Sequence, residues 1–257
     1  MTNWERQINI KSAAEIKLMR EAGRINAEAL LAVKEAIKPG VRTAELNEVA
    51  EAVHRKYGVY SPFKNYPGPY PYPGSICTSV NEELVHGIPG KRKLRSGDII
   101  SVDCGTVYEG FVGDSAFTVG VGEISAKARK LIEIAMKALD IATSLMVAGN
   151  HIGDIGAAIQ HYVESNGVYI TRTYTGHGVG RAMHEGPQVP NYGKPGQGVL
   201  LRDGMTIALE PMVLMGTGFT RVKSDEWTVV SKDGSLTTHY ENTVAVTADG
   251  PLILTAL

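Results

Sequence analysis

The chain has 257 residues, of which 43% are hydrophobic and 21% are charged, and its formal net charge is −1. Such a chain is long enough for a sizeable core, as one large domain or two small ones, and its composition is that of a soluble globular protein. The near-zero charge gives no electrostatic case for binding nucleic acid or an acidic membrane surface.

The cysteines and the apolar runs indicate the compartment. Two cysteines, Cys77 and Cys104, cannot form a disulfide framework and suit a reducing cytosol. Residues 1–6 lack the apolar segment of a signal peptide. No run approaches the ~20 apolar residues that a membrane helix needs, so we expect a cytoplasmic protein.

The first elements are two helices followed by an aromatic loop. A capping box at Ser12–Glu15 predicts a helix that continues toward Ala36. A second helix begins at Thr43, carries apolar residues at helical spacing and ends at Gly58. The Pro- and Tyr-rich stretch Ser61–Gly74 is either a polyproline ligand or a rigid aromatic wall beside a pocket. We favour the wall, because this stretch leads directly into a strand.

A strand pair with two acids follows. The apolar run Ile99–Val102 predicts a buried strand with Asp103 at its end. The turn-like stretch Val107–Gly110 separates it from a second acid, Asp114. A hairpin would bring the two carboxylates side by side. Because carboxylates that close repel, one must be protonated or a cation must lie between them.

The same order of elements then returns. A helix from Ala126 to Ala148 ends at Gly149, and another runs from about Ile152 to Gly167. A strand-like stretch with an acid at its end comes next, as it does after the first helix pair.

The acids of the first hairpin have counterparts in this second half. The stretch Leu201–Glu210 matches Leu94–Asp103 position for position, and Glu241 is the counterpart of Asp114. We interpret this as an internal duplication of an α+β half, with halves at about 12–120 and 125–250 in a single domain, 1–257. Four acids in two similar hairpins favour a shared cation site.

Three histidines lie in Gly-flanked settings beyond the helices. His177 lies between two glycines, and His86 and His184 each precede a Gly and a Pro within three residues. Any one of them alone would more often be a hydrogen-bonded core histidine, but beside four matched acids they indicate a site. The histidines in helical or cap contexts, which we expect at the surface, are His54, His151 and His161.

Motifs of several other enzyme classes are missing from the sequence. It contains no Walker phosphate loop, no Gly-x-Ser-x-Gly elbow and no His-Glu-x-x-His zinc helix.

The acids and histidines resemble the dimetal ligands of the methionine aminopeptidases in order and approximate spacing. The resemblance covers nearly the whole chain and includes Ile10–Ser12, Ser79–Glu82 and Gly176–Arg181. Only 32 residues separate His177 from Glu210. That leaves no room for the helical insertion of the type II enzymes, so the chain is similar to the short bacterial type I form. The resemblance implies the pita-bread α+β fold, with two pseudo-twofold halves around a dimetal site.

The resemblance also implies the metal ligands. Asp103 would bind one ion, His177 and Glu210 the other, and Asp114 and Glu241 both. Four carboxylates balance the charge of two divalent cations. Oxygen-rich ligation with one imidazole suits Co, Mn or Fe.

The implied reaction is removal of the initiator methionine from nascent proteins and peptides with a small second residue. A water or hydroxide that bridges the two ions would be the nucleophile. Glu210 would act as general base and acid. His184 would hydrogen-bond the developing oxyanion, and His86 would contact the scissile amide nitrogen.

A methionine pocket is implied as well, with aromatic and sulfur surfaces that suit a thioether. Its residues would be Tyr72, Cys77, Met183 and Trp227. Three positions depart from the family pattern and bear on the shape of the pocket, not on the reaction. Met183 stands where Phe is frequent, Pro69 stands where a pocket Tyr is common and Tyr70 would replace it, and His239 stands where Gln is frequent.

Two rival interpretations remain open at this point. Prolidase and aminopeptidase P share the dimetal core but usually carry a large extra amino-terminal domain. Binding proteins of this fold have lost ligands that this chain keeps. We expect a monomer that acts on the N-terminal methionine of nascent polypeptides, in transient proximity to the ribosome.

Overall fold

The computed structural model describes residues 8–257 of the chain. Residues 1–6, in which we expect no signal peptide, lie outside the described residues. Across residues 8–257, no helix is both long and apolar enough to cross a membrane.

The first helix pair begins and ends where the sequence predicts. Helix α1 (Ala13–Ala36) is capped by Ser12, whose hydroxyl accepts from the amide of Glu15 while the Glu15 carboxylate accepts from the amide of Ser12. Helix α2 (Thr43–Tyr57) ends at Gly58, which has a left-handed φ of 65°. The predicted capping box and helix stop are confirmed.

The second helix pair differs from the prediction at one end. Helix α3 spans Ala126–Ser144 and helix α4 spans Ile152–Ser165. The prediction that α3 continues to Ala148 is wrong. Asn150 donates through its side-chain amide to the carbonyl oxygen of Leu145 (2.9 Å), which fixes a turn after Ser144. Met146 is fully buried in this turn, so the apolar pattern continues past the helix.

The strands form one large sheet and two small ones. The large sheet has the order β1-β3-β4-β13-β8-β6-β7, with β14 also paired to β13, and the small sheets are β10-β11-β2 and β12-β9-β5. The strand bounds are β1 (Ile76–Val80), β2 (Glu83–Val85), β3 (Ile99–Tyr108), β4 (Phe111–Gly120), β5 (Tyr169–Ile170), β6 (Gly176–Gly178), β7 (Glu185–Val189), β8 (Thr206–Leu209), β9 (Met212–Leu214), β10 (Thr220–Val222), β11 (Val229–Ser231), β12 (Thr237–His239), β13 (Glu241–Thr247) and β14 (Gly250–Ile253).

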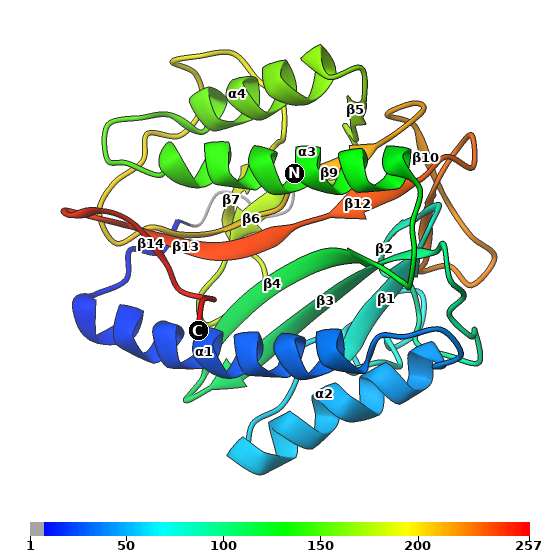
Figure 1. The fold of residues 1–257 in the computed structure, drawn as a ribbon. Coiled ribbons are helices and arrows are strands. Elements are labelled where there is room, and N and C mark those ends of the chain that lie inside the picture. Colours follow the sequence, from blue (N-terminus) through cyan, green and yellow to red (C-terminus); the bar gives the residue numbers. More distant parts are fainter. Residues whose placement is uncertain (1–7) are drawn as a thin grey trace.

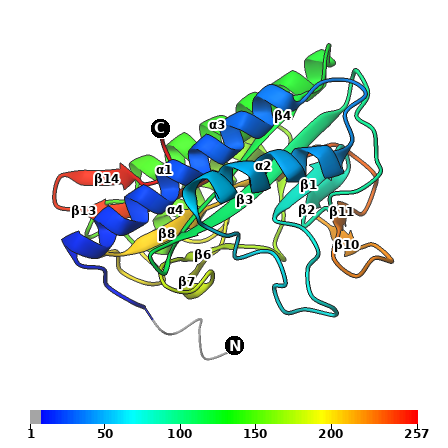
Figure 2. The same cartoon turned by 90° about the horizontal axis from the view of Figure 1, so that it is seen from below.

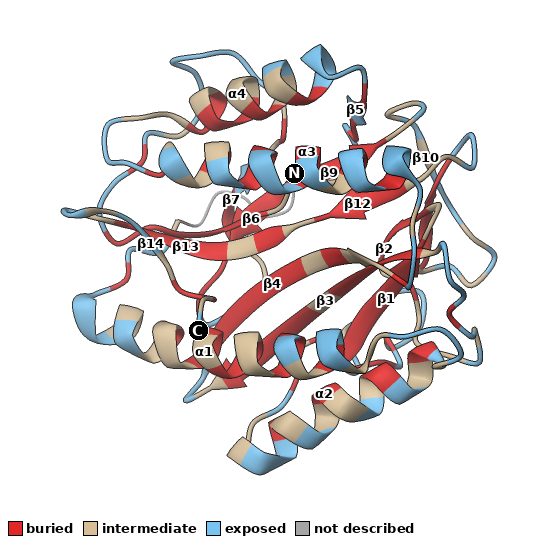
Figure 3. Cartoon of the chain, viewed as in Figure 1, coloured by how far each residue is buried: buried red, intermediate tan, exposed pale blue. Residues whose placement is uncertain are grey.

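The two helix pairs cover different parts of the sheets. Figure 1 shows α1 and α2 along β1, β3 and β4, and α3 along β9, β12 and β13, with α4 beside α3. Figure 2 shows α1 and α2 crossing the outer side of β1, β3 and β4. Most strands and the inner faces of the helices are buried, whereas β10, β14 and the outer helix faces are largely exposed (Figure 3). Each helix pair therefore closes a core against its own strands. The boundaries of a duplication, 12–120 and 125–250, stay a prediction.

The hairpin that carries the first two acids is longer than predicted. β3 runs five residues beyond Asp103, and the turn to β4 is centred on Glu109 and Gly110, whose φ values are 49° and 76°. Two successive positive φ values are those of the tight turn that matches strand twist. The hairpin itself, with both acids on it, is confirmed.

His54 contradicts the prediction that the helical histidines lie at the surface. It is only 4% exposed, on the inner face of α2, and its Nε2 lies 2.9 Å from the hydroxyl of Thr106 on β3. Burial lowers the pKa of His54 from 6.5 to about 4. His151 is half-buried at the start of α4, and His161 is exposed.

We expect His54 to make the protein less stable in acid. Its pKa is lower in the folded than in the unfolded chain, so the unfolded chain binds more protons below pH 6.5, and stability falls as the pH falls toward 4. The difference in free energy of unfolding between wild type and His54→Gln should fall by roughly 3 kcal/mol across this range. Each unit of pKa shift corresponds to about 1.4 kcal/mol. Urea denaturation at several pH values measures this. His161→Gln is the control. If the free energy of unfolding of His54→Gln differed from that of wild type by the same amount at every pH, the prediction would be contradicted.

Candidate metal centre

The strand register places three of the four predicted acids on one face of the large sheet. Ala116 of β4 lies opposite Asp103 of β3 and also opposite Glu241 of β13. Asp114 lies two residues from Ala116 on the same strand. Because directly opposed residues, and residues two apart on one strand, share a face of the sheet, the three carboxylates project to the same side.

The fourth acid, Glu210, lies opposite Glu241 at the point where the paired chains pass from the large sheet into a small one. Leu209 pairs with Asn242, and Met212 pairs with His239. The register is the same on both sides of Glu210, so the chain pair continues from the large sheet into the small one. His239 therefore shares a face with Glu241, two residues along.

His177 reaches the acids from the neighbouring strand. It lies opposite Ala208 of β8, and its Nδ1 lies 2.9 Å from the carbonyl oxygen of Gly178. If Nδ1 donates that hydrogen bond, Nε2 keeps its lone pair. Nε2 lies 3.8 Å from Asp114 Oδ2 and 3.6 Å from Glu210 Oε1.

Glycines on both sides of His177 allow this close packing. A Cβ at Gly176 would lie 2.5 Å from the carbonyl oxygen of Ala208, and a Cβ at Gly178 would collide with the carbonyl oxygen of Gly186. A larger residue at either position would separate β6 from its neighbours and move the imidazole away from the acids.

These side chains form two overlapping groups with metal-ligand spacing. Within each group the ligand atoms all lie within 4.8 Å of one another. One group is Asp114, His177 and Glu241, and the other is Asp103, His239 and Glu241. Glu241 belongs to both, which is the position of a bridging ligand.

The electrostatics of the cluster are unfavourable without a cation. Burial raises the pKa of each of the four carboxyls well above its usual range, and for Asp103, Asp114 and Glu241 the neighbouring carboxylates raise it further. Burial lowers the pKa of His177 to about 3, so its imidazole is neutral. Neutral imidazole and ionised carboxylate are the forms that bind metal.

The hydrogen bonding of the cluster fits a bound cation. Asp103 Oδ1, Asp114 Oδ1, Glu241 Oε1 and His239 Nε2 are buried and have no hydrogen-bond partner among the described residues. Unpartnered buried polar atoms are costly, and cations bound by Asp103, Asp114, Glu241 and His239 would account for these four.

A cavity of about 280 Å³ opens onto the cluster. Its walls include all of the predicted pocket residues, Tyr72, Cys77, Met183 and Trp227, together with His86 and His184. Phe63 and Tyr66 from the loop 61–74 complete the wall, so the prediction of an aromatic wall is confirmed. Tyr174, Thr173, Thr175, Val85, Gln188 and Met212 also line the cavity, and sequence reasoning did not single them out.

The expectation that Tyr70 takes the place of a pocket tyrosine is wrong. Tyr70 is 37% exposed, and its hydroxyl donates to the carbonyl oxygen of Asp225. Tyr66 faces the cavity instead, with its hydroxyl 2.7 Å from Nδ1 of His184. The loop sequence holds three tyrosines, and only the folded loop decides which of them turn inward.

We expect Tyr66→Phe to impair turnover without loss of metal. The variant removes the hydroxyl that holds Nδ1 of His184 and keeps the ring in the wall. Loss of one positioning hydrogen bond should slow turnover roughly 5-fold, since such a bond is worth about 1 kcal/mol. Peptide hydrolysis and metal titration calorimetry check this. Tyr70→Phe is the matched control, and equal rates for the two variants would contradict the prediction.

His86 is held in an unusual backbone conformation. Its φ is 60°, which a non-glycine residue rarely adopts. The next residue, Gly87, accepts from the amide of Thr78 (2.7 Å) and donates to the hydroxyl of Ser79 (3.1 Å). A Cβ at Gly87 would collide with the carbonyl of Thr78. These contacts fix His86 at the cavity wall.

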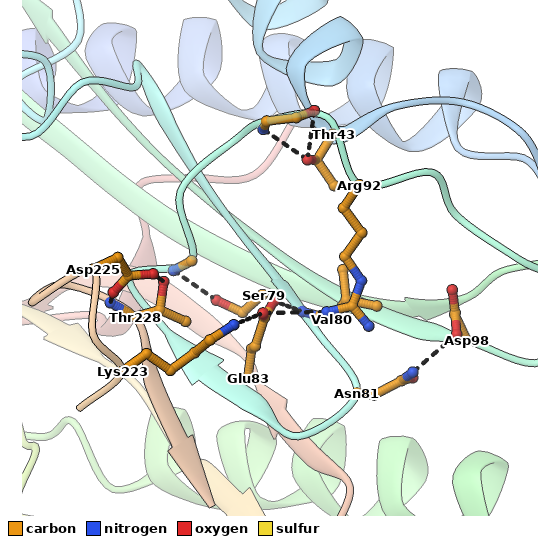
Figure 4. Close-up of polar contacts among 12 residues, drawn as sticks. Thr43, Ser79, Val80, Asn81, Glu83, Arg92, Asp98, Lys223, Asp225 and Thr228 are labelled. Atoms are coloured by element: carbon orange, nitrogen blue, oxygen red, sulfur yellow. Dashed lines mark hydrogen bonds and ion pairs between the residues drawn. The ribbon is translucent and has the colours of Figure 1, made fainter. Parts of the chain in front are cut away.

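The buried carboxylate of Glu83 braces β2, the strand that precedes His86. One oxygen accepts from the amide of Val80 (2.9 Å), and the other lies 3.0 Å from Lys223 Nζ and 3.1 Å from Arg92. Figure 4 shows Lys223 and Arg92 converging on Glu83 from different segments. The network ties β2 to the end of β1, to the residue after β10 and to the loop that carries Arg92.

A second buried ion pair orders the turn that carries Met183 and His184. Lys11 Nζ lies 2.5 Å from Glu185 Oε2, and both side chains are 5% exposed. The other oxygen of Glu185 accepts from the amides of Arg181 and Ala182. Burial is the largest influence and opposes ionisation of Glu185, but the hydrogen bond and charge of Lys11 and the backbone amide of Ala182 together outweigh it and hold the pKa below its usual range.

Comparison with known proteins agrees with this geometry. Residues 17–248 match the model of metallopeptidase family M24. The methionine aminopeptidase of Clostridium acetobutylicum is 51% identical over 96% of this chain and 98% of its own. Methionine aminopeptidase 1 of Bacillus subtilis is 46% identical over 95% of this chain and 98% of its own.

Solved structures share the fold. The crystal structure of methionine aminopeptidase from Thermotoga maritima superposes with a TM-score of 0.94 at 44% identity, and the match covers 97% of this chain and all of that one. Prolidase from Pyrococcus furiosus superposes with a TM-score of 0.78 at 22% identity, covering 99% of this chain and 67% of that one. The predicted pita-bread fold is confirmed. The chain belongs to metallopeptidase family M24.

Proposed function

We propose that this chain is an aminopeptidase that removes the initiator methionine from proteins and peptides, with divalent metal as cofactor. The observation that carries the proposal is the cluster of four acids and His177 at one side of a cavity walled by aromatic and sulfur-bearing residues. Relatives 51% and 46% identical over nearly the whole chain are methionine aminopeptidases.

The metal centre of the proposal holds two ions. Asp103 would hold one, His177 and Glu210 the other, and Asp114 and Glu241 both. The oxygen-rich ligand set with imidazole suits Co, Mn or Fe. When bound, such ions activate a water molecule and polarise the scissile carbonyl.

The groups around the cluster divide the remaining chemistry. Glu210 is partly accessible from the cavity and is proposed to accept and return the proton as general base and acid. Burial lowers the pKa values of His86 and His184 to about 4. Near neutral pH both imidazoles are neutral, so His184 can donate a hydrogen bond to a developing oxyanion and His86 can contact the scissile amide.

The pocket accounts for the methionine side chain. Tyr72 packs edge-to-face on Trp227 with ring centroids 5.2 Å apart, and Cys77 and Met183 add sulfur surface. Burial raises the pKa of the Cys77 thiol well above its usual range, so the thiol stays neutral. Soft, neutral walls of this kind suit an unbranched thioether.

The test is specificity with defined peptides. Met-Ala, Met-Gly and Met-Ser peptides should be cleaved, while Met-Lys and Met-Leu should be cleaved at least roughly 100-fold more slowly, as expected for a pocket that excludes large side chains by more than about 2.7 kcal/mol. Xaa-Pro peptides test the prolidase alternative, for which the structural neighbours at 22–24% identity support the fold alone. Equal kcat/KM for small and large second residues, or preference for Xaa-Pro, would overturn the proposal.

The cellular setting belongs to the same proposal. Because the proposed substrate is newly made polypeptide, we expect the chain to act in the cytoplasm, close to the ribosome. We also expect it to act as a monomer. Gel filtration and ribosome co-sedimentation test these two expectations.

A further inference from the structure

His239 enters the metal cluster from the small sheet. It is the last residue of β12, two residues before Glu241, and it is 2% exposed. Its backbone is held on both sides by Thr118 of β4, whose hydroxyl accepts from the His239 amide (3.0 Å) and donates to the His239 carbonyl (2.9 Å). The backbone of His239 is therefore fixed by its own strand and by the strand that carries Asp114.

The Nε2 atom at the tip of the His239 side chain makes no hydrogen bond to any described residue. Nε2 is buried and has no hydrogen-bond partner among residues 8–257. It lies 3.6 Å from Glu210 Oε2 and 3.5 Å from Glu241 Oε2. A histidine that served only to orient these carboxylates would donate to one of them at hydrogen-bond distance.

The spacing around His239 repeats the spacing around His177. His177 Nε2 stands 3.8 and 3.6 Å from its two carboxylates, and each oxygen of Glu210 faces a different one of the two imidazoles. Atoms that bind one ion at about 2.1 Å lie roughly 3.0 Å apart at a right angle and roughly 3.4 Å apart at a tetrahedral angle. The 3.5 Å between His239 Nε2 and Glu241 Oε2 suits an ion shared by these two residues as well as the distances at His177 suit the other ion.

We propose that His239 is a sixth protein ligand, whose Nε2 binds the ion on the Asp103 side of the cluster. Asp103, His239 and Glu241 form the group with metal-ligand spacing on that side. Each of the two ions then has one imidazole. Imidazole favours the later transition metals over cations that prefer oxygen ligands. This ligand therefore shifts the metal preference of the Asp103-side site toward Fe and Co relative to Mn. The inference rests on the proposed two-ion centre.

The experiment counts histidine ligands without using activity. Protein loaded with two equivalents of Co²⁺ is measured by proton NMR, in which each cobalt-bound imidazole gives a strongly shifted, solvent-exchangeable N–H signal. Wild type should show two such signals. His239→Gln should lose one and His177→Gln the other, while His184→Gln, which changes a pocket histidine outside both groups, should keep both.

Titration calorimetry with Co²⁺ gives the second readout. His239→Gln should weaken binding of one ion by at least roughly 10-fold, the lower end of the cost of losing even an outer partner of a metal ligand. A single shifted signal in wild type, lost only in His177→Gln, would overturn the proposal whether or not the variants fold well. So would wild-type affinity for both ions in a folded His239→Gln protein.

Hydrolysis of Met-Ala by wild type, measured in parallel, separates this inference from the proposed function. Cleavage with one shifted signal would remove His239 from the ligand set and leave the aminopeptidase intact. Two signals without cleavage would keep His239 as a ligand and count against the aminopeptidase.

Discussion

Glu241→Ala is expected to abolish hydrolysis of Met-Ala peptides and to lower bound metal below two ions per chain. Glu241 is the one acid that belongs to both groups with metal-ligand spacing, so its loss removes a ligand from each ion. The remaining carboxylates would repel one another with less cation charge between them. The activity loss should exceed roughly 100-fold, the upper end of what loss of an outer partner of a metal ligand costs. Asp114→Ala should behave alike, since Asp114 is only 2% exposed within the same cluster.

The measurements are steady-state kinetics and metal content after dialysis against buffer with a defined metal supply. Asp203→Ala is the control, because Asp203 is exposed and lies outside the cluster. Circular dichroism shows whether each variant is folded. Full activity in a folded Glu241→Ala or Asp114→Ala protein would remove these acids from the metal centre.

The sequence predicted those parts of the molecule that short stretches specify on their own. The capping box at Ser12 and the glycine after Tyr57 set helix ends through backbone contacts within a few residues. The acids of the cluster were found because each lies on or next to a strand, and strands of one sheet bring such positions together. The pita-bread fold followed from the resemblance, not from these local rules.

Other features depend on contacts between distant segments, and there the sequence was misleading. His54 sits in a helix with charged neighbours, yet the inner face of α2 packs it against Thr106 of β3. The apolar pattern of α3 continues past Ser144, but the turn closed by Asn150 ends the helix there. Tyr66 and Tyr70 are each followed by a proline in the same loop. Only the path of the folded loop turns Tyr66 toward His184.

His184→Ala and His86→Ala are expected to separate catalysis from metal binding. Both residues line the cavity but belong to neither group with metal-ligand spacing. His184→Ala removes a proposed donor to the developing oxyanion, worth ~10²–10³ in kcat. His86→Ala removes a contact to the scissile amide, where proton handling contributes roughly 10²–10⁴. Metal affinity should stay near that of wild type in both.

His177→Ala should instead lose metal and activity together, because its Nε2 faces Asp114 and Glu210 at 3.8 and 3.6 Å. The contrast is sharp because His177 and His184 are neighbours, with ring centroids 4.4 Å apart. A loss of metal that followed mere disturbance of the cavity would affect both variants alike. Calorimetry and kinetics on the three variants under one metal supply make the comparison. If His184→Ala loses metal as readily as His177→Ala, then His184 is part of the metal centre and its proposed action on the carbonyl is wrong.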